Sequence, residues 1–431
     1  MKKSWFVVLM LFLAGVISYL DRSALSIAAP LITKELGLQP AQLGIVFSAF
    51  FVGYAAFCFV GGYASDRFGA KRVLGGAMTL WSVFCGLTAA VSGLGSLLVV
   101  RAIFGIGEGP YAACTNKMVS GWFTPDKRTT AVGIANAGQQ FGGAIAGPIV
   151  GFLALRFGWR VSFIAIGVLG VAWVLVWAFT VKDKPDANAA HGDAATGGRL
   201  ADDMRAPVDG SAAAVAKPLR AYLTDLQILA TSFAFFGSAY ILYFFLSWFP
   251  SYLTMERHLS LASMSVVNVI PWAMGAVGLA IGGGVSDLLF RITGNALLAK
   301  KLVIVVSLVV AAACIAVAGV AASIVTAVLL LAVTVFFMSM TVGVYWGVIM
   351  DVVEPARVGA VGGFMHLIAN AAGIVAPALT GFLVQWTGLF QSAFVVSGGV
   401  ALLGALGVVC FVRAKPPAGT ARGGQPVPLQ G

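Results

Sequence analysis

Long apolar segments follow one another along almost the whole chain, separated by short polar stretches. Each segment has about 20 residues, the length at which a helix crosses the hydrocarbon core of a bilayer. We identify twelve of them, near residues 5–31, 43–64, 73–92, 96–118, 129–153, 160–181, 228–253, 264–290, 302–320, 323–349, 358–384 and 390–413. The pattern predicts an all-α integral membrane protein with twelve transmembrane helices.

One stretch interrupts this pattern. Residues 183–220 are rich in Ala, Gly, Pro and charged residues and have no apolar period, a composition typical of a solvated linker. We therefore expect an N-terminal six-helix bundle over residues 1–182, a flexible cytoplasmic linker over 183–220 and a C-terminal six-helix bundle over 221–413. Residues 414–431 are expected to form a disordered cytoplasmic tail.

The two halves repeat each other. The pattern Gly62-x3-Asp66 recurs 221 positions later at Gly283, and Gly151-Phe-Leu recurs 230 positions later at Gly381. Both offsets correspond to six helices plus the linker. They predict two pseudo-symmetric bundles, related by an axis along the membrane normal.

Composition and charge refine this topology. The chain is 60% hydrophobic, 10% charged and carries a net charge of +11. When the loops are assigned to alternate sides, most Lys and Arg residues fall on the side of the N-terminus, which places both termini in the cytoplasm of an inner membrane. The first segment follows Lys2-Lys3 like a signal peptide, but it continues to Pro30 and the topology requires it as an uncleaved helix.

No enzyme pattern is present. The sequence has no catalytic carboxylate pair in a soluble domain, no phosphate-binding loop and no metal-ligand cluster. We therefore expect no enzymatic activity, no metal and no cofactor. The positive charge indicates topology and not binding to nucleic acid, and any transport is expected to be driven by an ion gradient.

Two charges lie inside the fourth apolar segment. Arg101 and Glu108 are seven residues apart, so they share a helix face about 10 Å apart along the axis. Gly105 and Gly107 flank this face and permit close helix contact. Because intramembrane charges are costly, they favour an inward-facing proton and anion site; a structural ion pair, or an arginine that reaches toward the surface, is the alternative.

A second charged cluster lies in the first segment. Tyr19 and Arg22 lie on one helix face, on which Arg22 can bind a ligand carboxylate with two hydrogen bonds. Asp21 points elsewhere, and Arg101 is its expected partner. The alternative is that Asp21 and Arg22 cap the outer end of a helix that stops there. In the second segment, Tyr54 either contacts the ligand or packs in the core.

The loop between the second and third segments reads Gly62-x3-Asp66-Arg67-x-Gly69-x-Lys71-Arg72. Its glycines permit a tight turn, and Asp66 can cap a helix start. In a twelve-helix chain this loop resembles the major facilitator superfamily. Together with Tyr19-Leu-Asp21-Arg22 and Arg101-x6-Glu108-Gly-Pro110, the chain resembles the anion:cation symporter branch, which includes bacterial galactonate and hexuronate carriers.

The resemblance also implies roles for further residues. It implies that Gln139 contacts the substrate, that Asn370 belongs to the same site, and that Asp66 and Arg67 form a conformational latch. Gln140 is rotated away from Gln139 and is expected to bridge helices. Where the resemblance implies a neutral amide, this chain has His366, either as a structural residue or as a proton relay.

The second half is nearly free of charged residues within its apolar segments. Trp346 either stacks on a ligand or fills the core, and Tyr243 and Trp248 are expected to be interfacial anchors. We expect substrate contacts from six residues and proton coupling from three, with a small carboxylate, protons and the lipid bilayer as partners of a monomer. The expected substrate-binding residues are Tyr19, Arg22, Tyr54, Gln139, Trp346 and Asn370; the expected coupling residues are Asp21, Arg101 and Glu108.

The resemblance implies a proton-coupled symporter that imports a sugar acid, an aldonate or a hexuronate, by alternating access. A carrier of tartrate or an aromatic acid, and a membrane nutrient sensor that binds without transporting, remain alternatives. Proton-driven export of apolar cations is disfavoured by the intramembrane Arg22 and Arg101.

Overall fold

The computed structural model describes residues 3–183, 218–354 and 357–413. The first half contains α1 (Lys3–Leu36), α2 (Pro40–Phe68), α3 (Ala70–Leu87), η1 (Thr88–Ala90), α4 (Leu94–Glu108), α5 (Tyr111–Trp122), α6 (Pro125–Phe157) and α7 (Trp159–Thr180). The second half contains α9 (Leu219–Leu223), α10 (Leu226–Ser251), η3 (Tyr252–Glu256), α11 (Leu261–Val267), α12 (Val269–Thr293), α13 (Ala296–Val320), α14 (Ile324–Val352), α15 (Val358–Thr387) and α16 (Gln391–Phe411).

These elements form 12 spans that are long and apolar enough to cross a membrane, which confirms the predicted fold class. Two spans are interrupted. The fourth breaks at Gly109-Pro110 between α4 and α5, and the eighth breaks at Asn268 between α11 and α12. By contrast, α1 continues through Asp21 and Arg22 to Leu36, so these charges do not cap a helix end.

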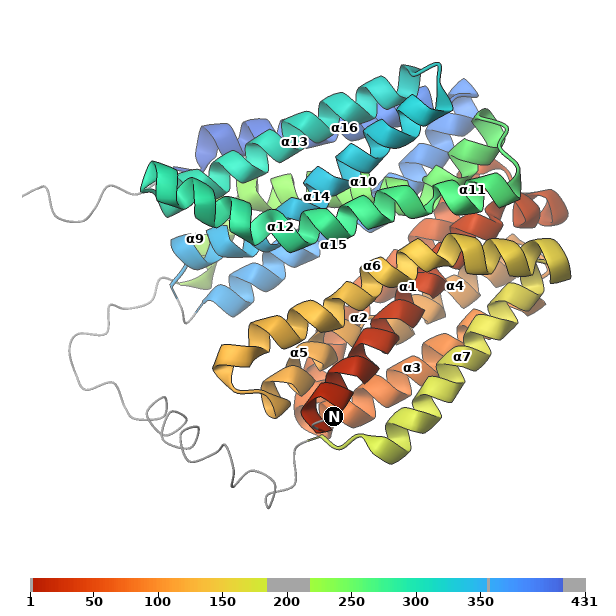
Figure 1. Cartoon of the computed structure of the whole chain (residues 1–431), viewed down its shortest axis with the longest axis horizontal. Helices are drawn as coiled ribbons and strands as arrows, with labels where there is room; N and C mark the ends of the chain where they lie inside the picture. The colour runs from red at the N-terminus through yellow and green to blue at the C-terminus, as the bar shows by residue number, and fades with distance from the viewer. Residues whose placement is uncertain (1–2, 184–217, 355–356, 414–431) are drawn as a thin grey trace, which may run out of the picture.

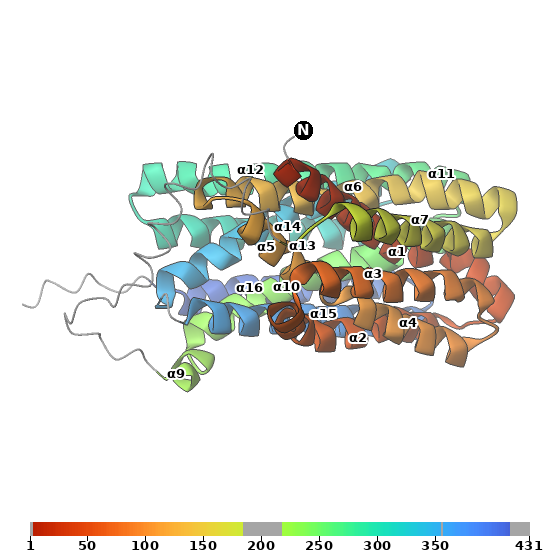
Figure 2. The same cartoon turned by 90° about the horizontal axis from the view of Figure 1, so that it is seen from below.

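The spans form two bodies that lie side by side, α1–α7 below and α10–α16 above in Figure 1. Seen from below in Figure 2, the helix axes of both halves lie roughly along the long axis of the molecule. The N-terminus, the end of α7 and α9 lie toward the same end of the molecule, which we call the linker end. The opposite end is called the distal end. The predicted linker and tail fall mainly on residues 184–217 and 414–431, outside the described residues.

The halves contact each other toward the distal end. Gly44 of α2 packs against Pro377 and Gly381 of α15, and Gly147 of α6 packs against Ser265 of α11. Two hydrogen bonds cross the same boundary: Ser48 donates to the Ile374 carbonyl at 2.7 Å, and the Gln385 side chain accepts from the Ala41 N–H at 3.1 Å. We call this set of contacts between α2, α6, α11 and α15 the distal seam.

Within the first half, glycine allows the charged helix to approach its neighbours. A Cβ on Gly105 of α4 would clash with the Phe50 carbonyl of α2, and one on Gly107 would lie 2.8 Å from the Trp81 N of α3. No side chain fits at these positions without separating the helices. The expected close packing at Gly105 and Gly107 is confirmed, and it places Glu108 deep in the bundle.

The distal ends of the halves carry matching carboxylates. In the first half, Glu35 accepts from Trp159 Nε1 at 2.6 Å and pairs with Arg160, whose Nε donates to the Ala89 carbonyl at 3.0 Å. Glu256 lies 221 positions after Glu35, and its Oε2 accepts from the Phe390 N–H at 2.7 Å. The carboxylate is therefore bound by side chains in the first half and by a backbone N–H in the second.

The turn after α2 corrects one prediction. Gly69, at φ 88°, joins α2 directly to α3, as only glycine does readily. The prediction that Asp66 caps a helix is wrong, because the Lys71 N–H in the first turn of α3 is bound by Asp183 Oδ1 at 2.6 Å. The residue that follows the sixth span thus holds the start of the third.

Candidate functional site

A buried ion pair joins α1 to the end of α4. Arg22 Nε donates to Glu108 Oε1 at 2.7 Å, and the Ser18 hydroxyl donates to the same oxygen. The two residues are 7% and 0% exposed, respectively. Glu108 Oε2 has no hydrogen-bond partner among the described residues. The carboxylate predicted to exchange protons therefore lies directly on the arginine predicted to bind an anion.

Aromatic rings surround the Arg22 guanidinium. Its Cζ lies 4.5 Å from the ring centroid of Tyr54, 4.8 Å from that of Phe50 and 5.4 Å from that of Tyr19. Cation–π contacts of this kind stabilise a cation away from bulk water. The structure thus brings the predicted residues Tyr19, Arg22 and Tyr54 together.

Arg101 is placed differently from the expectation. Its guanidinium lies over Phe50 and Phe104, 5.1 and 4.8 Å from their centroids, and no described carboxylate lies within ion-pair distance. Arg101 Nε has no hydrogen-bond partner within the described chain. The expected pairing of Arg101 with Asp21 is therefore wrong in this conformation, and Arg101 is a buried cation without a counter-ion among the described residues.

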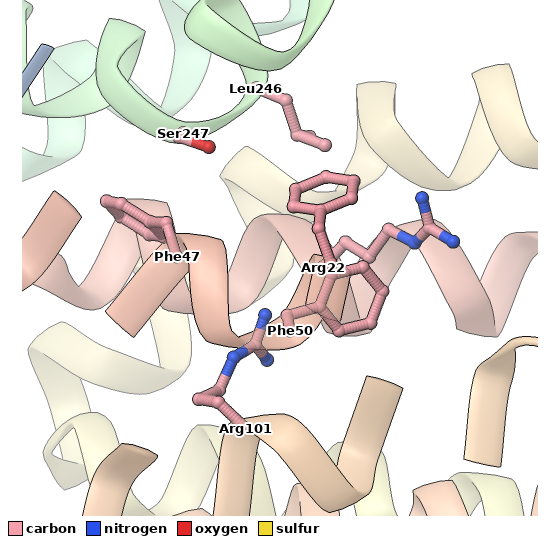
Figure 3. Close-up of a pocket in the computed structure, with 7 residues that line it drawn as sticks. Arg22, Phe47, Phe50, Arg101, Leu246 and Ser247 are labelled. Carbon is pink, nitrogen blue, oxygen red and sulfur yellow. The ribbon is translucent and has the colours of Figure 1, made fainter. Parts of the chain in front are cut away.

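Both arginines line one pocket between the halves. Its lining residues are Arg22, Phe47, Phe50, Phe51, Arg101, Leu246 and Ser247. Figure 3 shows Arg22 and Arg101 pointing in different directions around Phe50, with Leu246 and Ser247 of α10 across from them. A pocket with two guanidinium groups and aromatic walls suits a small organic anion.

Asp21 has a thiol neighbour in place of a cation. Cys85 Sγ of α3 donates to Asp21 Oδ1 at 3.3 Å, and Asp21 Oδ2 is buried without a hydrogen bond in the described chain. A carboxylate without a counter-charge is costly to ionise in such surroundings. Asp21 therefore remains a candidate proton carrier, beside the Arg22–Glu108 pair but not part of it.

Three polar side chains form a connected group in the second half. The Tyr243 hydroxyl donates to Asn370 Oδ1 at 2.9 Å, and Asn370 Nδ2 lies 2.8 Å from His366 Nδ1. Trp346 lies beside His366, with ring centroids 6.1 Å apart. The interpretation of Tyr243 and Trp248 as interfacial anchors is wrong, since both are buried and Trp248 Nε1 donates to the Pro377 carbonyl.

A series of edge-to-face and tilted ring contacts connects this group to Arg22. The ring centroids of Tyr243 and Phe51 are 4.4 Å apart, and those of Phe51 and Phe50 are 4.9 Å apart. The Phe50 ring in turn contacts both arginines. Reading the sequence did not identify Phe50, Phe51 or Tyr243 as site residues. A local signal existed in the aromatic run Phe50-Phe51 followed by Tyr54 on one helix, but their partners lie on other helices.

The two glutamines of α6 occupy different places. The Gln139 backbone N lies next to Gly15 of α1, at the α1–α6 contact, and its side chain is half-buried. Gln140 Oε1 is buried without a hydrogen bond among the described residues and faces Gly275 of α12. Gln140 therefore lies against a helix of the second half, but a bridge between helices through its amide and a ligand contact by Gln139 both stay predictions.

The predicted latch residues lie at the linker end. Asp66 Oδ1 pairs with Lys117 Nζ of α5 at 2.6 Å, and Lys117 Nζ also donates to the Ser65 carbonyl. Arg67 rests on the Phe68 ring, 5.5 Å from its centroid. These contacts stay within the first half, so the latch between the halves remains a prediction. Among the described residues, no cluster of three His, Cys, Asp or Glu side chains suits a metal.

Comparisons with known proteins agree that the chain is similar to transporters. A family model described as the Major Facilitator Superfamily matches residues 11–365 and 295–430. A hexuronate transporter of Bacillus subtilis (strain 168) is 49% identical over 423 residues, which cover 96% of each chain. A probable sulfoacetate transporter of Cupriavidus necator is 34% identical over 90% of this chain and 89% of its own. A probable galactarate/D-glucarate transporter of Escherichia coli (strain K12) is 30% identical over 96% of each.

Solved structures resemble the fold at lower identity. An inward-open xylose transporter from E. coli has a TM-score of 0.76 at 15% identity and covers 96% of this chain and 98% of its own. A bacterial homologue of the human lysosomal transporter Spinster, in an inward-facing and occupied conformation, has a TM-score of 0.72 at 18% identity and covers 95% of each chain.

Proposed function

The chain belongs to the major facilitator superfamily, and from this premise we propose that it is a proton-coupled symporter that imports a sugar acid of the hexuronate or aldonate type. The observation that supports this most directly is the buried Arg22–Glu108 pair at a pocket shared with Arg101. The class of substrate is supported by the name of the 49% identical relative, a hexuronate transporter.

Coupling follows from competition for one cation. Ionised Glu108 occupies Arg22 Nε and repels an arriving carboxylate. Protonation of Glu108 removes that repulsion and frees guanidinium N–H groups for the substrate. Proton and anion therefore bind best together, with a coupling free energy of about 1–3 kcal/mol, as is usual between linked sites.

The remaining site residues have distinct roles in this proposal. Tyr19, Tyr54, Gln139 and Asn370 engage substrate hydroxyls, and Trp346 borders the site near the linker end. Arg101 supplies positive charge to the pocket but no direct contact with Glu108 or Asp21. Asp21, held by Cys85, is the second proton carrier. No cofactor is required, because the proton gradient supplies the free energy.

The membrane orientation follows from charge and contact. We place the linker end and both termini in the cytoplasm, because the Lys and Arg residues of the loops gather there. The described contacts between halves lie toward the distal end, so the conformation is inward-facing. Alternating access then requires the distal seam to open while the linker ends approach. We expect a monomer in the inner membrane to suffice.

Proteoliposomes test this proposal with Glu108→Gln, which imitates the protonated carboxyl. The wild type should accumulate labelled glucuronate under an inward proton gradient. Glu108→Gln should still exchange glucuronate in counterflow, because its site binds the anion, but should not accumulate it above equilibrium. Normal accumulation by Glu108→Gln would move the coupling role to Asp21. Binding without any flux in the wild type would favour the sensor alternative.

A further inference from the structure

His366 is one of the few ionisable groups in the spans of the second half, and neither the Arg22–Glu108 pair nor the coupling mechanism uses it. It lies on α15, one turn toward the linker end from Asn370. It is half-buried, with ring centroids 6.1 Å from both Phe235 and Trp346. Its hydrogen bonds show which of its two ring nitrogens is available.

The amide of Asn370 has a defined orientation. Its Nδ2 lies 2.8 Å from the His366 backbone carbonyl, which only accepts, and its Oδ1 lies 2.9 Å from the Tyr243 hydroxyl. Reversing the amide would put two acceptors together at the carbonyl. The nitrogen therefore faces α15 and the oxygen faces Tyr243.

This orientation fixes the histidine tautomer. Asn370 Nδ2 also lies 2.8 Å from His366 Nδ1. Because an amide nitrogen only donates, Nδ1 must accept, and the neutral ring carries its proton on Nε2. No hydrogen bond from Nε2 to a described residue is present. His366 is thus held as an uncharged donor with one free N–H, between two aromatic rings.

The geometry points to His366 Nε2–H as the group that recognises the end of the substrate opposite its carboxylate, and that favours sugar monoacids over diacids. This inference rests on the proposed function, in which Arg22 binds the first carboxylate. Edge-to-face and tilted ring contacts from Phe50 through Phe51 to Tyr243 connect Arg22 with the His366 group. A hexuronate or aldonate presents an uncharged hydroxyl or carbonyl oxygen at that end, which a neutral N–H can bind.

An aldarate would instead place a second carboxylate there. A carboxylate removed from water needs a cation or several donors, and the side chains that share a ring contact or hydrogen bond with His366 within the described chain are Phe235, Trp346 and Asn370. Lys300, which reaches the next turn of α14 at Gly347, is already paired with Asp351 at 2.7 Å. The second carboxylate would therefore be poorly compensated.

Two amide substitutions separate a binding role from a structural one. In His366→Gln the amide nitrogen can occupy the position of Nε2, whereas in His366→Asn it can occupy only that of Nδ1. We expect His366→Asn to weaken glucuronate binding about tenfold, the cost of an unpaired polar group, and His366→Gln to remain close to wild type. His258→Asn, an exposed histidine in the distal loop after η3, is the matched control.

A third variant tests the preference itself. His366→Arg supplies a permanent cation, so competition by glucarate relative to glucuronate should rise about tenfold or more. Calorimetric titration of the purified proteins with glucuronate, gluconate and glucarate measures all four variants, with the thermal midpoint recorded for folding. Retained affinity in His366→Asn together with loss in His366→Gln, or an unchanged glucuronate-to-glucarate ratio in every folded variant, would overturn the inference. A wild type that binds no sugar acid would instead overturn the proposed function.

Discussion

At the scale of single residues, the site depends on how one guanidinium is shared. Arg22 uses Nε for Glu108 and its planar face for Tyr54 and Phe50, and its remaining N–H groups make no hydrogen bond to a described residue, so that they can bind an anion. A lysine would keep the charge but not the fork of donors or the flat face.

Arg22→Lys should therefore weaken glucuronate binding by about 10- to 100-fold, the range expected when a charge-assisted hydrogen bond is lost. Titration calorimetry on the purified protein measures this. Arg160→Lys, which changes an arginine at the distal end, should leave the dissociation constant unchanged. Equal affinities in Arg22→Lys and the wild type would place the anion on Arg101.

Sequence reasoning succeeded where residue type alone was informative. An Arg, an Asp or a Glu inside an apolar run predicts an interior site, and the structure brings Arg22, Glu108 and Tyr54 together. Sequence reasoning failed where the role of a side chain depends on a contact with a residue far away in the sequence. In the sequence, Tyr243 resembles an interfacial anchor, but in the structure its hydroxyl donates to Asn370, 127 positions away. Arg101 was expected to pair with a carboxylate, but no described carboxylate lies within ion-pair distance of it.

At the scale of helices, the number of spans was predictable, because the bilayer fixes the length of an apolar span and segments of that length can be counted along the sequence. The break at Gly109-Pro110 also has a local cause in its sequence, whereas the break at Asn268 has no such signal. Which helices touch was not predictable, although small residues marked the close contacts. Gly105 is the clearest case, because its neighbour is the backbone carbonyl of Phe50, which cannot move aside like a side chain.

Gly105→Ala should therefore push α4 away from α2 and destabilise the first half by about 1–3 kcal/mol, the usual cost of overpacking. The measurement is the apparent thermal midpoint in detergent, which should fall by several degrees. Gly76→Ala is the control, since nothing lies within 4 Å of the added methyl group, and alanine favours the helix. Equal midpoints in the two variants would contradict the packing argument.

At the scale of the whole molecule, two bodies meet at the distal seam. The repeat in sequence predicted two similar bundles, and the paired offset of Glu35 and Glu256 extends that repeat to the distal ends. The conformation was not predictable, because the inward-facing and outward-facing states use the same apolar faces of the same helices.

If transport requires the seam to open, joining it covalently should stop transport. Ala41→Cys with Gln385→Cys places two thiols where the Ala41 N–H meets the Gln385 side chain. A short bifunctional thiol reagent should abolish glucuronate uptake, while binding from the linker end persists. Each single cysteine variant treated in the same way is the control. Full transport by the cross-linked protein would show that access does not alternate through this seam.

The chemical composition of the distal seam determines how its stability responds to the surrounding solution. Its described contacts are glycine, proline and serine backbone contacts with a few neutral hydrogen bonds, and no described ion pair spans it. Contacts without net charge are little affected by screening. The free energy that holds the distal seam closed should therefore vary little with salt concentration, and the charged groups of the site, Arg22, Arg101 and Glu108, are not part of the seam.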